Sequence, residues 1–113
     1  MNIIKYILNS RIATSGNFSP KIQRKLGLKI LNKKIYKEAF THSSLNLKDS
    51  YGKAINFERL EFLGDAILTA VISEHLYNNY PDANEGSLTK LRAKIVSRVK
   101  LNQIGEELGL FEL

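Results

Sequence analysis

The chain has 113 residues, a length that suits one small domain with a single core. Apolar residues make up 43% and charged residues 25%, which excludes the disordered, collagen-like and membrane-embedded classes. The net charge is +6 and there is no cysteine, so disulfide frameworks and thiolate metal sites are excluded.

The positive charge is concentrated in the first half of the chain. Residues 1–57 hold 11 lysines and arginines against 2 acids, whereas residues 58–113 hold 6 against 9. A basic half of this kind attracts a polyanion such as nucleic acid, although a lysine-rich solvated surface explains the excess equally well. The start, MNIIKYILNS, lacks the features of a secretory signal, and no apolar run reaches membrane-spanning length. We therefore expect a cytoplasmic protein.

All the predicted elements are helices, and no alternating strand pattern stands out. Ser19 and Pro20 are typical of a helix start, and Ser87 is a candidate N-cap later in the chain. In chain order, the expected helices cover about residues 2–12, 21–26, 34–43, 57–80, 88–99 and 101–108, with a polar loop over 46–55 and stops at Pro81 and Gly109. The sequence thus predicts a single all-α domain over residues 1–113.

The central helix places three carboxylates on one side. At about 100° per residue, Glu58, Glu61 and Asp65 share an arc of roughly 60°. Leu60, Leu63, Ile67 and Val71 form an apolar stripe on the opposite side, which we expect to face the core. Apolar residues also flank the carboxylates, so the helix is apolar nearly all round and we expect it to be buried.

Buried carboxylates must be paired, protonated or bound to a ligand. Three explanations stay open from the residues alone: a divalent metal, a cluster of basic side chains, or a subunit interface that shelters Phe62. Oxygen ligands without cysteine favour Mg²⁺ or Mn²⁺, which can activate water for phosphodiester hydrolysis. The alternative without a metal is a structural role, in which the acidic face forms salt bridges with Arg59, Arg92 or Arg98.

The run ERLEFLGDAIL, Glu58–Leu68, resembles the signature motif of the ribonuclease III family. The segments EAFTHSS, residues 38–44, and NEGSLTKLRAKIVS, residues 84–97, resemble the segments on either side of that signature. The resemblance covers about residues 20–113. It implies an all-α homodimer that cuts double-stranded RNA and leaves 5′-phosphate and 3′-hydroxyl ends.

The resemblance also implies roles for individual residues. Glu61 and Asp65 match the carboxylates that bind the Mg²⁺ of these enzymes, for which Mn²⁺ can substitute. Glu58 matches a glutamate that supports the site or the dimer interface, and Glu85 matches an acidic residue near the cleavage centre. Phe62 matches the aromatic residue that inserts into a socket on the other subunit.

Two features of the family pattern are missing from the sequence. The second acidic pair, an Asp followed three residues later by a Glu, is not found, and neither is a double-stranded-RNA-binding domain. We therefore expect an amino-terminal part of the catalytic domain, with weakened Mg²⁺ affinity and activity. The alternative function is a non-catalytic module that binds RNA or mediates dimerisation.

Several polar residues are candidates for RNA contacts. His42 could approach an RNA phosphate and Ser43 or Ser44 could donate a hydrogen bond to it, although a helix-end or packing role is the competing explanation. Lys90, Lys94 and Arg98 recur every four residues and could follow a phosphate backbone, or form a solvated face.

Overall fold

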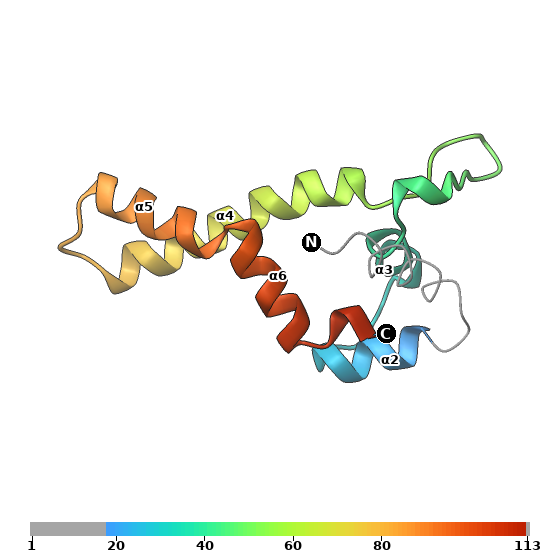
Figure 1. Cartoon of the computed structure of the whole chain (residues 1–113), viewed down its shortest axis with the longest axis horizontal. Coiled ribbons are helices and arrows are strands. Elements are labelled where there is room, and N and C mark those ends of the chain that lie inside the picture. Colours follow the sequence, from blue (N-terminus) through green and yellow to red (C-terminus); the bar gives the residue numbers. More distant parts are fainter. Residues whose placement is uncertain (1–17, 113) are drawn as a thin grey trace.

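The computed structural model describes residues 18–112, and the regular structure in that range is entirely helical (Figure 1). The elements are α2 (Phe18–Leu26), α3 (Lys33–Ala39), η1 (Ser43–Leu45), α4 (Glu58–Asn79), α5 (Glu85–Ile95), α6 (Arg98–Glu107) and η2 (Leu110–Glu112). The prediction of an all-α fold is confirmed. The helix expected over residues 2–12 lies outside the described residues.

The loop predicted over residues 46–55 is also present. It contains one isolated antiparallel bridge, between Lys48 and Ala54. Asp49 organises the turn inside it, because Asp49 Oδ1 accepts the backbone N–H groups of Tyr51 and Lys53, both at 2.9 Å. Across the described part of the chain, no helix has the length and apolar character needed to cross a membrane.

α4 and α5 form an antiparallel pair, in which α5 lies along the second half of the longer helix (Figure 1). Leu76 is the buried residue of α4, with only 3% of its surface exposed. Arg92 of α5 donates a hydrogen bond from Nη1 to Ser73 Oγ at 2.9 Å, and the Ser73 hydroxyl donates in turn to the Thr69 carbonyl at 2.6 Å. This chain of hydrogen bonds fixes the register of the two helices.

The helix starts differ from their predicted positions. α5 begins at Glu85, because Asn84 is its N-cap and accepts the Ser87 N–H at 2.9 Å, so the prediction of a Ser87 cap is wrong. α2 already includes Ser19, so the predicted Ser19 cap is wrong as well. α3 is capped by Asn32 and ends at Ala39, four residues before the predicted end.

A second correction concerns the end of α5. Ser97 has an extended backbone, and its hydroxyl accepts the Lys100 N–H at 3.2 Å, so it caps a new helix. The predicted continuous helix through Val99 is therefore wrong, because the helix is interrupted between Ile95 and Arg98 and the chain changes direction there (Figure 1).

A small core joins α2, α3 and η2. Ile22 and Ile30 are buried, with Leu26, Tyr36, Phe40 and Leu110 packed against them. Gln23 helps close this core, because its side-chain oxygen accepts the Ile30 N–H at 2.9 Å. η2 thus packs beside α2, so the chain returns to its first described helix (Figure 1).

The apolar stripe of α4 does not face a core within the described part of the chain. Leu63, Ile67 and Val71 are each more than half exposed, and Leu60 is half-buried. α5 packs on the other side instead, against the side of α4 that carries Leu76. The prediction that this stripe faces the core, and the prediction that the helix is buried all round, are both wrong for the described residues.

Candidate functional site

The candidate site lies on the first half of α4. Glu58 and Glu61 lie in the first turn of the helix, where negative side chains interact favourably with the helix dipole. Phe57 precedes the helix without a side-chain cap, and Asn56 Oδ1 accepts the Glu58 N–H at 3.0 Å instead. Asp65 follows Glu61 by one helical turn, on the same side.

This part of α4 is uncovered because α5 is too short to reach it. At about 1.5 Å per residue, the 22 residues of α4 extend about 33 Å and the 11 residues of α5 about 16 Å. α5 starts at the far end of the pair, so it covers only the second half of α4. Glu58, Glu61 and Asp65 are accordingly exposed.

The exposure of the three carboxylates corrects the expectation that they are buried. In water a carboxylate needs no partner, so the cost of burying a charge does not arise. Within the described chain none of the three forms an ion pair, and Arg92 is bonded to Ser73. The alternative of an acidic face neutralised by arginines is therefore not what the described residues show.

Glu58 lies at a groove that Glu61 and Asp65 do not line. The groove has a volume of about 800 Å³ and runs between α3, the 46–55 loop and the start of α4. Its charged lining residues are Lys34, Glu38, Asp49, Lys53, Glu58 and Arg59. Sequence reasoning missed this groove, because it joins segments about 20 residues apart and no local pattern signals such a contact.

Glu85 lies at the other end of the α4–α5 pair. It lines a cavity of about 660 Å³ with Glu74, Tyr77 and Arg92, and its carboxylate accepts the Thr89 hydroxyl at 3.2 Å. Glu74 is nine residues beyond Asp65, or about 14 Å along the helix. The structure thus brings Glu61 and Asp65 together but places Glu85 apart from them.

No set of three or more His, Asp or Glu side chains in residues 18–112 is arranged to hold a metal ion. Glu61 and Asp65 still provide two hard oxygen donors one turn apart, with open space beside them. Mg²⁺ commonly takes one or two carboxylates and completes its shell with water and substrate phosphate. The residues present therefore fit part of a Mg²⁺ site.

Phe62 stands out among these carboxylates, because 82% of its surface is exposed. It lines the groove together with Leu63, which is also exposed. An exposed phenyl group costs solvation free energy, and groups of exposed apolar side chains commonly mark interaction surfaces. Its setting is compatible with the predicted insertion into another subunit.

His42 and Ser43 lie at the start of η1, which precedes the 46–55 loop in the chain. His42 caps η1: its Nδ1 accepts the Ser44 N–H at 3.1 Å and lies 2.8 Å from Ser44 Oγ. Its ring also lies 5.6 Å from that of Phe57. The helix-end role is thus present, and the half-buried Ser43 forms the first residue of η1.

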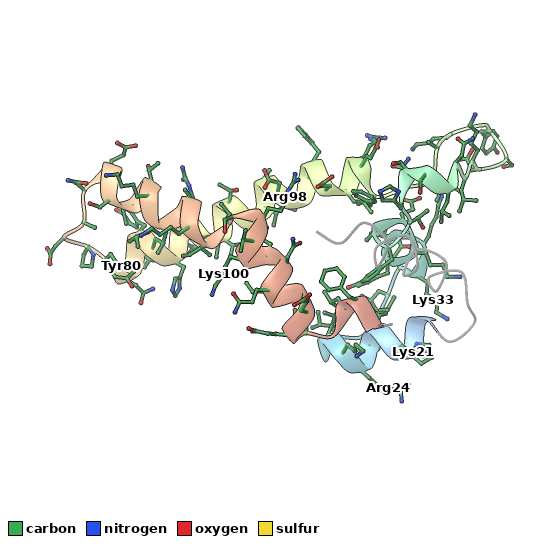
Figure 2. The ribbon with its side chains drawn as sticks, in the orientation of Figure 1. Lys21, Arg24, Lys33, Tyr80, Arg98 and Lys100 are labelled. Carbon is green, nitrogen blue, oxygen red and sulfur yellow. The ribbon has the colours of Figure 1, made fainter. Side chains whose placement is uncertain are left out.

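The predicted stripe of cations is divided between two helices. Lys90 and Lys94 are exposed on α5, whereas Arg98 is the first residue of α6 and lies at the corner between the two (Figure 2). The three side chains remain available to an anion, although they do not follow one helix face.

Comparisons with known proteins find a matching family and several relatives. A family profile described as Ribonuclease-III-like matches residues 32–113. The chain is 52% identical over 110 residues to "Ribonuclease 3" of Zunongwangia profunda, which covers 97% of this chain and 45% of the relative. It is 49% identical over 113 residues to "Ribonuclease 3" of Flavobacterium psychrophilum, covering 99% of this chain and 46% of the relative. No solved structure matches the chain.

The family profile covers the all-α part of the chain that carries the acidic turn on its longest helix. The chain belongs to the ribonuclease III family, because the profile matches most of its length and the relatives match nearly all of it. The predicted resemblance is confirmed. The chain spans a little under half the length of these two relatives.

Proposed function

We propose that the protein is an endoribonuclease that hydrolyses phosphodiester bonds of double-stranded RNA. The observation that carries this proposal is the pair Glu61 and Asp65, which are exposed one turn apart in the segment that matches the family. Two uncompensated carboxylates at the surface are poorly suited to bind a polyanion by themselves. A divalent cation held by the pair would neutralise that charge and would offer its remaining coordination positions to a phosphodiester oxygen.

Glu61 and Asp65 would hold Mg²⁺, or Mn²⁺ as a substitute. A bound divalent ion polarises a phosphoryl oxygen and lowers the pKa of a water ligand, which supplies a nucleophile near neutral pH. The other residues position the substrate and the site. Glu58 supports the start of α4 from the groove, and Glu85 is assigned an accessory acidic role from the far end of the helix pair.

RNA contacts are assigned to residues on either side of this site. His42 and Ser43 would approach the phosphates from η1, and Lys90, Lys94 and Arg98 from α5 and α6. Double-stranded RNA is recognised mainly through its shape, its 2′-hydroxyls and its phosphates, which suits exposed cations and hydroxyls. Phe62 and Glu58 would form part of a homodimer interface, because the exposed phenyl group needs a partner to leave water.

The proposal is tested with Asp65→Asn in the protein as it is encoded. The amide keeps the shape of the side chain but binds Mg²⁺ weakly, so cleavage of double-stranded RNA should fall by more than about 100-fold, since metal stabilisation is worth several kcal/mol. Binding of the same duplex in Ca²⁺ should persist. Glu74→Gln, an exposed acid on the same helix, is the matched control and should cut normally. Unchanged cleavage by Asp65→Asn would remove Asp65 from the site.

A second candidate is a non-catalytic RNA-binding or dimerisation module. It is favoured by the absence, within residues 18–112, of a third metal-binding side chain near Glu61 and Asp65. The same experiment separates the two functions. If the unaltered protein binds duplex RNA but does not cut it in either Mg²⁺ or Mn²⁺, the protein is a non-catalytic module.

A further inference from the structure

A surface rich in lysine covers α2, α3 and the segment between them. Between residues 18 and 41 there are seven basic residues against one acid. We name this the α2–α3 basic surface, which consists of Lys21, Arg24, Lys25, Lys29, Lys33, Lys34 and Lys37. Figure 2 shows Lys21 and Arg24 along α2 and Lys33 on the same side of the view, whereas Lys100 lies away on α6.

The basic side chains have no acidic partners among residues 18–112. All but Lys21 are exposed, and Lys21 is half-buried. None of the seven forms an ion pair with another described residue. Because the seven cations lie within 17 consecutive residues, many of them are within or near one Debye length of each other, about 10 Å at 0.1 M salt. They repel one another, and a bound polyanion removes that repulsion.

The basic surface borders the groove that leads to the candidate site. Lys34 of α3 lines the 800 Å³ groove, whose opposite wall includes Glu58 and Arg59 at the start of α4. Lys53 and Arg59 add two further cations to the groove, and Glu38, Asp49 and Glu58 bring the net charge of its lining to zero. A rigid polyanion seated on α2 and α3 can therefore extend along the groove to the helix that carries Glu61 and Asp65.

We propose that the α2–α3 basic surface binds the phosphate backbone of double-stranded RNA beside the cutting site and holds the flanking part of the duplex. This inference rests on the proposed function. Exposed Leu28 and Leu31 lie among these lysines and would also suit an anionic membrane surface. The continuity with the groove and α4 favours RNA, because a flat membrane cannot follow the surface into the groove.

The test removes two charges from this surface and, as a matched control, two charges from elsewhere. The first variant is Lys29→Gln with Lys33→Gln, and the control is Lys48→Gln with Lys100→Gln. All four side chains are exposed, and their amino groups form no hydrogen bond or ion pair with another described residue, so the helical circular dichroism of both variants should match that of the unaltered protein. The dissociation constant for a short RNA duplex is measured in Ca²⁺ over a range of KCl concentrations.

Each phosphate contact contributes about one unit to the slope of log K against log salt concentration. The first variant should therefore lower the magnitude of that slope by about 2, while the control leaves it unchanged. An unchanged slope in the first variant, or an equal fall in both, overturns the inference even though the protein binds and cuts RNA.

Two further outcomes separate the inference from its foundation. Binding to anionic phospholipid vesicles should be the same for the unaltered protein and for the variant Lys29→Gln with Lys33→Gln. A variant that loses vesicle binding but binds RNA as before assigns the surface to membranes and overturns the inference. Unaltered protein that binds no RNA duplex overturns the proposed function together with the inference. Retained cleavage with unaffected RNA binding by the first variant leaves the proposed function intact and removes only the role of the basic surface.

Discussion

The two sides of α4 should respond very differently to truncation of a side chain. Leu76 is 97% buried against α5, and Leu76→Ala leaves a cavity there, so the free energy of unfolding should fall by about 2 to 5 kcal/mol. Ile67 lies on the opposite side with 56% of its surface in water. Since fully burying such a side chain is worth about 1.5 to 3 kcal/mol, Ile67→Ala should cost only about 1 kcal/mol.

Both values follow from urea unfolding monitored by circular dichroism, with the shift in midpoint at constant slope taken as the change in stability. Val71→Ala is a useful companion, because Val71 is exposed to nearly the same extent as Ile67 and should behave like it. A loss at Ile67 as large as that at Leu76 would refute the reasoning. It would mean that other residues or a second copy cover this side of α4 in solution.

The remaining predictions concern four single positions. Asn84→Ala removes the N-cap of α5 and should lower stability by about 1 kcal/mol in the same urea assay. Gly109→Ala should destabilise by more than about 1 kcal/mol, because the glycine has φ +68°, which other residues rarely adopt. Gly64→Ala, at a helical site with open space, should stabilise by about 1 kcal/mol. Phe62→Ala should shift the protein toward monomer in light scattering without loss of helix, and an unchanged mass would exclude Phe62 from a dimer interface.

Local signals in the sequence predicted the helices well. The central helix was expected over residues 57–80 and is found at Glu58–Asn79, because Pro81 cannot continue a helix and the polar loop before it cannot begin one. Gly109 was expected to end the last helix and does so with a positive φ that favours glycine. The ends of these helices depend only on residues close in the sequence, so they can be predicted without knowing the tertiary structure.

The caps were predicted less well, since two polar residues compete for the same role. Asn84 and Ser87 both suit an N-cap, and only the structure shows that Asn84 accepts the hydrogen bond from Ser87. The same ambiguity applies to Ser97, whose capping role divides a segment with continuous apolar periodicity. Competing local hydrogen bonds of this kind differ by less free energy than sequence patterns can resolve.

The core-facing side of α4 could not be predicted, because it depends on what packs against the helix. The stripe of Leu63, Ile67 and Val71 satisfies the usual rule for a buried face, yet α5 selects the side with Leu76. That side is also the one on which the carboxylates lie, so the predicted separation of an apolar core face from an acidic face does not hold. The carboxylates therefore lie on the same side of α4 as Leu76, beyond the part of the helix that α5 covers.

The break at Ser97 decides whether the carboxylates are accessible. α5 ends at Ile95, and because the pair is antiparallel, a helix extended by a further two turns would lie over Asp65 and Glu61. The capping hydrogen bond from the Lys100 N–H to Ser97 instead turns α6 away from α4 (Figure 1). One side-chain hydroxyl therefore helps to keep a surface open that an uninterrupted helix would close. The proposed site thus depends on α5 ending early as much as on the acidic residues themselves.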